Sequence, residues 1–407
     1  MILLSHPTAN QNVRQAALAL VEANLLAEFW TCLNWKQGGL IDHSLPARFR
    51  KELGRRSFSE RVEPFLITFP WREAARLLSQ QLGLSSLTRG ETGIFSLDAV
   101  YQSLDRQVAK RLVRNHRIDS VYAYDNGALE SFRAAKRRGL KCIYEHPIAY
   151  WREVRRYQQE EADLHPEWKP TLGALQDSEE KLARKDAELA LADVVIVPST
   201  FSKNSLRDAA ALRAPVQVLP YGVPQVSDAP KENRGAKLAV LFVGALTQAK
   251  GLSYLLAAAA KLERHIDLTL IGNRVSPVIP SQAVLDKHHW IPSLAYDDLL
   301  REMSRRDVLV LPSLHEGFGL VIGEAMAHGL VVIATPNTAA PDLIDDGIDG
   351  FIVPIRSASA IAEKLELLLQ DPARLREMKL AARRKAAAHG WEVYRRGLAL
   401  LAREVVS

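Results

Sequence analysis

The stretch EGFGLVIGEAMAHGLVVIAT, residues 316–335, places two glutamates, Glu316 and Glu324, around a tight pair of glycines. It follows the apolar run DVLVLPS and ends on the apolar run LVVIAT. Two Val/Ile/Leu runs separated by a glycine turn and a helical segment predict strand, turn, helix and strand. Strands of this composition are buried on both faces, as in a parallel sheet. The glycine turn then lies at the carboxyl edge of the sheet, where open parallel sheets bind ligands.

The same alternation extends outward from this stretch through most of the chain. Strand–helix units are predicted at 1–29, 120–147, 178–210, 237–263 and 266–306. The first unit reads as a strand over 1–7 followed by a helix over 10–29, while residues 40–95 are less regular. Strands that alternate with helices in this way indicate an α/β protein with parallel sheets.

Length and one polar stretch indicate two domains. A chain of 407 residues is too long for one ordinary core, and two domains of roughly 200 residues are expected. Residues 224–237, PQVSDAPKENRGAK, gather loop-forming residues between apolar runs and are typical of a linker. The predicted architecture is therefore two doubly wound, Rossmann-like domains that face a central cleft.

Composition restricts the class of protein. Hydrophobic residues make up 47% of the chain and charged residues 25%, which is ordinary for a soluble enzyme. No apolar run reaches the ~18 residues of a membrane span, and the opening MILLS lacks the charged start of a signal peptide. The two cysteines, Cys32 and Cys142, lie far apart and suggest reduced thiols. These features predict a cytoplasmic protein.

Basic residues give the chain a formal charge of +6 and concentrate in two segments of the N-terminal half. The clusters are Arg48, Arg50, Lys51, Arg55, Arg56 and Arg61, and Arg133, Lys136, Arg137, Arg138, Lys141, Arg152, Arg155 and Arg156. Such clusters form either solvated helix faces or surfaces attracted to anionic lipid or to a charged acceptor. No zinc-finger, helix-turn-helix or stacked-aromatic pattern accompanies them, so a nucleic-acid partner is not expected.

The glycine turn of the opening stretch suits a phosphate-containing ligand. Gly317 and Gly319 let the backbone turn tightly and approach a ligand closely. The free N–H groups at the start of the following helix favour an anion, and a diphosphate suits them. Glu316 and Glu324 would repel that diphosphate, so they are expected to accept hydrogen bonds from hydroxyls, those of one ribose and one sugar. The alternative is a surface glutamate and a helix-face glutamate with no ligand.

The segment PSLHEGFGLVIGEAMAHGLVVIAT, residues 312–335, resembles the signature of the family 4 retaining glycosyltransferases of the GT-B fold (glycosyl transferases group 1). Further segments resemble the family in order and spacing: LFVGALTQAKGLSYLL, VVIVPSTFSKNSL, VLPYGVP, DLIDDGIDGFIVP and HGWEVYRRGLALL. The resemblance is strong over 190–400 and weak before about residue 115. It implies an acceptor-binding domain over 1–224, a nucleotide-sugar-binding domain over 236–388, and a terminal helix, 389–407, that crosses back to the first domain.

The resemblance also implies roles for particular residues. Glu324 would bind the ribose hydroxyls of a nucleotide, and Glu316 the hydroxyls of the transferred sugar. Lys250 would neutralise the diphosphate as it leaves. The backbone amides that hold the diphosphate would belong to Phe318, Gly319 and Leu320.

The loop after the first strand of the second domain departs from the family. The family usually has an arginine soon after Gly244, the glycine of this donor-binding loop, but here Ala245 and Leu246 follow. One phosphate partner is therefore missing at Ala245, and Arg274, after the run LIGN, is a candidate to replace it.

His146, which follows a strand of the first domain, matches the family's histidine that reaches across the cleft to the donor sugar. From the residues alone, a lone histidine before a proline is more often structural. Asp125 ends the strand VYAY and is expected either to orient the acceptor or to cap a helix. The chain contains no Asp-x-Asp, so no divalent metal and no other cofactor is expected.

These features predict a retaining, metal-independent hexosyltransferase that moves a sugar from a nucleotide-diphosphate sugar to a glycan or lipid-linked acceptor. Surface polysaccharide biosynthesis is the expected context, with peripheral association at the inner face of an anionic membrane. The competing hypotheses are a GT-B sugar-nucleotide epimerase or phosphorylase, and an inert nucleotide-sugar-binding subunit, which Ala245 suggests.

Overall fold

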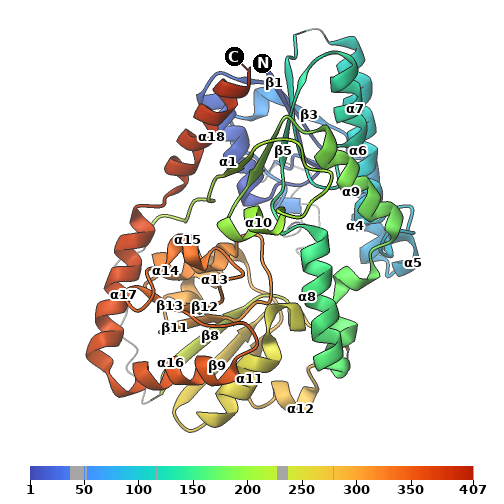
Figure 1. Cartoon of the computed structure of the whole chain (residues 1–407). Helices are drawn as coiled ribbons and strands as arrows, with labels where there is room; N and C mark the ends of the chain where they lie inside the picture. Colours follow the sequence, from blue (N-terminus) through green and yellow to red (C-terminus); the bar gives the residue numbers. More distant parts are fainter. Residues whose placement is uncertain (37–49, 51–52, 116, 227–236, 278, 407) are drawn as a thin grey trace.

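The computed structural model describes residues 1–36, 50, 53–115, 117–226, 237–277 and 279–406 (Figure 1). Two sheets form its two halves. The first has seven strands in the order β3-β2-β1-β4-β5-β6-β7, and the second has six in the order β10-β9-β8-β11-β12-β13. Neighbouring strands are parallel throughout both sheets. The predicted α/β class with two doubly wound sheets is confirmed.

The strands follow the apolar runs of the sequence. The first sheet consists of β1 (Ile2–Ser5), β2 (Leu26–Thr31), β3 (Leu66–Thr68), β4 (Ser120–Tyr124), β5 (Lys141–Glu145), β6 (Val194–Val197) and β7 (Val216–Val218). The second consists of β8 (Leu238–Val243), β9 (Ile266–Ile271), β10 (His289–Ile291), β11 (Val308–Leu311), β12 (Val331–Ala334) and β13 (Gly350–Ile352). Every residue of β11 and β12 is buried, as expected for central parallel strands covered on both faces.

Helices cover both faces of each sheet. In the N-terminal domain they are α1 (Gln11–Glu22), η1 (Glu63–Phe65), α4 (Trp71–Gln81), α5 (Ser85–Thr88), α6 (Leu97–Arg114), α7 (Leu129–Arg137), α8 (Trp151–Leu164), η2 (Pro166–Thr171), η3 (Gly173–Gln176), α9 (Glu179–Leu191) and α10 (Thr200–Ser205). In the C-terminal domain they are η4 (Gln248–Lys250), α11 (Leu252–Lys261), α12 (Gln282–Leu285), α13 (Tyr296–Met303), α14 (Leu320–Ala327), α15 (Ala340–Leu343), α16 (Ala358–Gln370) and α17 (Pro372–Ala387). The chain ends in α18 (Trp391–Val406).

One predicted element is wrong. The helix expected over 10–29 ends at Glu22, and β2 begins at Leu26. Asn24 has a φ of 56°, a left-handed conformation that stops a helix, and the apolar residues after it pair with β1 instead. Alanine and leucine alone do not separate a helix from a buried strand, so the boundary was missed.

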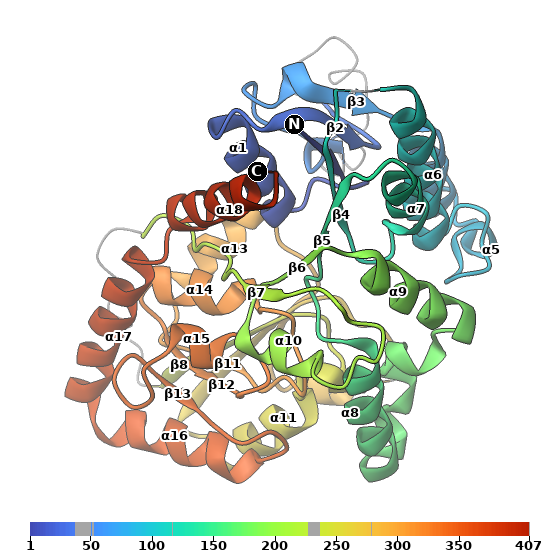
Figure 2. The same ribbon diagram turned by 45° about the horizontal axis from the view of Figure 1, so that its top comes forward.

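The C-terminal helix α18 lies along α1 of the N-terminal domain (Figure 2). Arg395 of α18 donates hydrogen bonds to Glu22 at 2.9 Å and to Gln15 at 2.7 Å. An apolar cluster continues from α1 through Tyr221 and Phe318 to α18, so it joins the two halves. The predicted domain limits remain a prediction, because most of the predicted linker lies outside the described residues.

Candidate functional site

The signature loop connects β11 to α14, as the sequence predicts. Two hydrogen bonds fix its course: the Glu316 N–H donates to the Asn337 carbonyl at 2.8 Å, and the Asn337 side chain donates to the Leu314 carbonyl at 2.8 Å. Gly319 precedes α14 with a φ of 81°, a conformation that favours glycine. Phe318 is buried, and its ring lies 5.3 Å from that of Tyr221. Residues Phe318, Gly319 and Leu320 therefore form the rigid N-terminal turn expected to bind a diphosphate.

Gly317 brings this loop against the N-terminal domain. A Cβ at this position would lie 1.8 Å from the carbonyl oxygen of Pro147, so only glycine fits. The Gly317 carbonyl accepts hydrogen bonds from the hydroxyls of Ser199 at 2.6 Å and Ser202 at 2.9 Å. Ser199 caps the start of α10, and Ser202 lies in its first turn. The signature loop and the loop after His146 are thus in direct contact.

Lys250 and Glu316 meet at the carboxyl edge of the second sheet. Lys250 ends η4, in the loop that follows β8, and its ammonium forms an ion pair with the Glu316 carboxylate. Gly244 lies beneath the lysine, since a Cβ there would be 3.7 Å from Lys250 Cε. Burial lowers the pKa of Lys250 to about 8, and the Glu316 carboxylate beside it opposes that fall. The structure therefore pairs Lys250, which is expected at the diphosphate, with Glu316, which is expected at the sugar.

Glu324 lies in the second turn of α14, as predicted. Burial raises the pKa of its carboxyl group, and a hydrogen bond from Tyr296 opposes the rise. Tyr296 is the first residue of α13, and 48% of it is exposed. No local pattern in the sequence pointed to this tyrosine, because only the fold brings α13 beside α14.

The loop after β8 lacks the family's arginine, and Arg274 lies beside it. Leu246 and Arg274 form a β-bridge, and the Leu246 N–H donates to the Asn273 carbonyl at 2.9 Å. Arg274 donates one hydrogen bond to Gln282 at 3.3 Å, and its buried Nε has no hydrogen-bond partner among the described residues. The Arg274 guanidinium therefore lies next to the loop that contains Ala245. This position agrees with the hypothesis that Arg274 replaces the missing arginine.

On the opposite domain, His146 follows β5 and is 4% exposed. Its Nδ1 lies 3.5 Å from a carboxylate oxygen of Asp125. Within the described part of the chain, neither ring nitrogen makes a hydrogen bond of acceptable geometry. Packing and the contact with Asp125 therefore position the imidazole, and its ring nitrogens remain able to form hydrogen bonds to a ligand.

Asp125 is the centre of a buried charge network. Lys185 of α9 lies 3.1 Å from its carboxylate, and the Tyr144 hydroxyl donates to it at 2.8 Å. Burial raises the pKa of Asp125, but Lys185, His146 and Tyr144 together hold it below the ordinary value. The helix-capping alternative for Asp125 is wrong: the first N–H groups of α7 donate instead to Glu188, and those of Glu130 and Ser131 to Asp105.

The basic clusters are mostly engaged within the protein. Arg56 is buried against Glu73, with a hydrogen bond of 2.7 Å. In the second cluster Lys136 pairs with Asp193 at 2.7 Å, and Arg155 with Glu179 at 2.8 Å. Arg48 and Lys51 lie outside the described residues. The solvated-face interpretation thus explains much of the charge.

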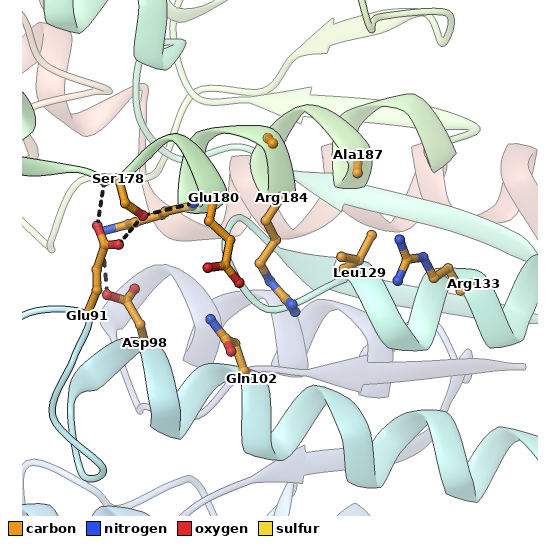
Figure 3. A pocket seen from close by; sticks show the side chains of 11 residues that line it. Glu91, Asp98, Gln102, Leu129, Arg133, Ser178, Glu180, Arg184 and Ala187 are labelled. Carbon is orange, nitrogen blue, oxygen red and sulfur yellow. Dashed lines mark hydrogen bonds and ion pairs between the residues drawn. The ribbon is translucent and has the colours of Figure 1, made fainter.

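A polar pocket of about 390 Å³ lies in the N-terminal domain between α6, α7 and α9 (Figure 3). Lys181 lies within it, 2.7 Å from Asp177, 3.5 Å from Asp98 and 3.8 Å from Glu91. The pocket contains none of the predicted site residues. Its charges compensate one another, so its lining supports the helix packing and supplies no evident ligand site.

Comparison with known proteins finds a family match in the C-terminal half of the chain. Residues 225–385 match the model of the family described as glycosyl transferases group 1. An MMP alpha-(1->4)-mannosyltransferase of Mycolicibacterium hassiacum is 28% identical over 294 residues, which are 68% of this chain and 69% of the relative. A D-inositol 3-phosphate glycosyltransferase of Streptomyces avermitilis is 32% identical over 250 residues, 53% of each chain.

Solved structures share the whole architecture. Sucrose-phosphate synthase from Thermosynechococcus elongatus has a TM-score of 0.69 at 20% identity and covers 99% of this chain and 98% of its own. The Anabaena protein HepE in complex with UDP-glucose has a TM-score of 0.63 at 16% identity, with 99% of both chains covered. Residues 225–385 thus resemble the group 1 glycosyltransferases, and the whole chain has the GT-B fold. In the described part of the chain, no helix is both long and apolar enough to cross a membrane.

Proposed function

We propose that the protein is a family 4, retaining hexosyltransferase that uses a nucleoside-diphosphate sugar without a metal ion. The observation that carries the proposal is the meeting of Lys250, Glu316 and the start of α14 at one sheet edge, in contact through Gly317 with the loop after His146. This arrangement supplies a cation, helix N–H groups and a carboxylate where a sugar diphosphate would lie.

Relatives support a nucleotide sugar as donor. HepE is described with UDP, with UDP-glucose, and with UDP and glucose, and the matched Mycolicibacterium relative is named a mannosyltransferase. We infer a hexose donor of this class. Glu324 and Tyr296 would bind the ribose, the amides of Phe318, Gly319 and Leu320 the diphosphate, and Glu316 the hexose.

In the proposed reaction the bond between C1 of the hexose and the β-phosphate oxygen breaks. A hydroxyl of the acceptor forms the new bond to C1 on the same face, and its proton passes to the departing phosphate oxygen. Lys250, the start of α14 and Arg274 would stabilise the charge that develops on this oxygen. Contact between the two domains excludes water, which limits hydrolysis of the donor.

The acceptor would bind against the N-terminal domain. His146 lies at the carboxyl edge of the first sheet, held beside Asp125, and would bind a hydroxyl of the transferred hexose. We propose a glycan or lipid-linked acceptor in surface polysaccharide biosynthesis, at the cytoplasmic face of a membrane.

One face of α4 supports peripheral membrane association better than the basic clusters do. Trp71, Leu78 and Leu82 recur at helical spacing and are 74%, 52% and 63% exposed. The neighbouring helix α6 exposes the basic residues Arg106, Lys110 and Arg114. Exposed apolar residues on one helix and exposed basic residues on a helix that contacts it are suited to an anionic bilayer surface. The wild type should pellet with anionic vesicles at low salt. The double variant Leu78→Glu/Leu82→Glu should not.

The function is tested by measuring thermal stabilisation across a panel of nucleotide sugars that includes UDP-glucose and GDP-mannose. A donor at 100 times its dissociation constant adds about 2.7 kcal/mol to the free energy of unfolding. The donor found in this way is then assayed for nucleoside-diphosphate release and for glycoside formation. Stabilisation with neither product would favour the inert binding subunit, and release of a rearranged sugar would favour the epimerase.

A further inference from the structure

Helix α8 leaves the N-terminal domain directly after the loop that contains His146, and it runs alongside the C-terminal domain (Figure 1). Its start is fixed to the N-terminal domain. The Tyr150 hydroxyl donates to Asp186 at 2.8 Å, and the Trp151 indole donates to the same oxygen at 2.7 Å. The Tyr150 N–H also donates to the Ser205 hydroxyl at 2.8 Å.

The second half of α8 is fixed to the C-terminal domain through Glu161. This carboxylate is fully buried and accepts three hydrogen bonds from the other domain. The donors are Gln248 at 2.6 Å, Tyr254 at 2.7 Å and Arg356 at 2.9 Å. Gln248 belongs to η4, the same short helix that ends at Lys250. Glu161 therefore holds the loop that presents the lysine.

One turn earlier, Gln158 reaches the other loop of the site. Its Oε1 accepts from the Ala174 N–H at 2.9 Å, so its amide nitrogen points the other way. That nitrogen lies 3.0 Å from Nε2 of His315, the residue before Glu316. Because an amide N–H donates here, His315 must accept at Nε2 and bear its proton on Nδ1. Burial lowers the pKa of His315 to about 4, with a smaller effect from Lys250, which agrees with a neutral ring.

We propose that α8 positions the donor site from the opposite domain: Gln158 holds the loop that carries Glu316, and Glu161 holds the loop that carries Lys250. Both are positioning residues, since each acts through a neighbour. The inference rests on the proposed function, because it takes Lys250 and Glu316 as the donor-binding pair. With one end fixed beside the His146 loop and the other on these two loops, α8 sets the separation between the histidine and the donor.

The two contacts predict different kinetic effects. Gln158→Leu removes the hydrogen bond to His315 and frees the loop of Glu316, whose partner is the sugar. It should lower turnover about tenfold, equal to about 1.4 kcal/mol, and leave the affinity for UDP or GDP within about twofold. The matched control is Gln159→Leu, since Gln159 is exposed on the same helix and bonds only to Asp163 among its described contacts.

Glu161→Gln removes one of the two carboxylate partners of Arg356, whose other partner is Glu160 at 3.0 Å. It also loosens the loop of Lys250, whose partner is the diphosphate. The affinity for whichever of UDP and GDP binds should fall about tenfold. Tyr254→Phe removes one of the three hydrogen bonds to Glu161 with little change in volume, and it should give a smaller loss of the same kind. Glu167→Gln, on a carboxylate whose side chain is 61% exposed, is the control.

The closing experiment measures donor turnover, UDP and GDP affinity, and the ¹⁵N shifts of His315 in the wild type and these variants. We expect an unprotonated Nε2 in the wild type and in Gln159→Leu, and a changed tautomer population in Gln158→Leu. If the wild type turns over the donor, and Gln158→Leu and Glu161→Gln equal their controls in turnover and in affinity, the inference about α8 is overturned while the proposed function stands. A wild type that binds and turns over no nucleotide sugar would overturn the proposed function, and with it the role of α8.

Discussion

In the C-terminal domain, Lys250 and Glu316 stand on loops whose course is set by glycines and backbone hydrogen bonds. In the N-terminal domain, His146 and Asp125 are instead placed by a buried network that reaches Lys185 on another helix. The turns of the first arrangement follow from short, contiguous sequence, although Gln158 and Glu161 of α8 also contact these two loops. The second depends on residues that meet only after the domain has folded.

This difference predicts that substitutions on the two sides of the site have different effects. Breaking a buried ion pair by removing one partner leaves an uncompensated charge and costs about 3–5 kcal/mol. Substitutions around Asp125 should therefore lower both stability and activity. Substitutions in the glycine-bounded loops should lower donor binding or turnover while the fold persists.

The largest effect is expected at His146. His146→Ala removes a group placed near the reacting sugar and should lower turnover by about 10²–10⁴-fold. His146 is buried beside Asp125, so the melting temperature should fall, but the protein should stay folded at the temperature of the assay. His289→Ala, at an exposed position, is the control, and native turnover in His146→Ala would leave the histidine a structural role only.

Lys250→Ala should follow, with a loss of at least about 10²-fold in kcat/KM, equal to about 2.7 kcal/mol. A charge-assisted hydrogen bond to phosphate contributes about 1.5–3 kcal/mol, and its removal also leaves the leaving-group charge poorly compensated. Lys261→Ala, on an exposed lysine of α11, is the matched control. Full activity of Lys250→Ala would place the diphosphate elsewhere.

A smaller effect, about tenfold, is expected where this chain departs from the pattern of the group 1 glycosyltransferases that its C-terminal half matches. Arg274 stands beside the loop of Ala245. If it supplies the missing cation, Arg274→Ala should weaken nucleoside-diphosphate binding and Ala245→Arg should restore it in the double variant. Calorimetric titration of the single and double variants measures this directly. No loss in Arg274→Ala, with a gain in Ala245→Arg alone, would show that the phosphate lacks a second cation.

The smallest effect is a dependence on pH. Lys250 has a pKa lowered to about 8, so the cation dominates below that pH and is lost as the pH rises through it. Nucleoside-diphosphate affinity should therefore fall several-fold above about pH 8. Glu316 opposes the shift, so Glu316→Gln should move the decline to lower pH, whereas Lys250→Arg should abolish it, since arginine stays charged. A decline that Lys250→Arg does not remove would contradict the assignment.

The contrast between the domains also sets how much could be predicted from the sequence. The strand, glycine turn and helix of residues 312–335 and the loop before Gly251 could be predicted, because the hydrophobic periodicity and the glycines that define them are local in the sequence. The alternation of strands and helices also gave the fold class. The partners Lys185, Tyr296 and Gln158 could not be predicted, because each reaches the site from a distant helix and none belongs to a local motif. The predicted end of the helix over 10–29 was wrong for a related reason. The residues after Asn24 form β2, which pairs with β1, and this pairing could not be predicted from the local sequence.

We propose that the two glutamates divide the donor between them. Calorimetric titration of UDP and GDP against the wild type, Glu324→Ala and Glu316→Ala tests this division. Glu324→Ala should lose about 10–100-fold in affinity for the nucleoside diphosphate, because we propose that Glu324 binds the ribose. Glu316→Ala should keep the wild-type affinity within about threefold, yet lose most of its turnover with the nucleotide sugar. Equal affinity of the wild type and Glu324→Ala, or a loss of affinity confined to Glu316→Ala, would contradict it.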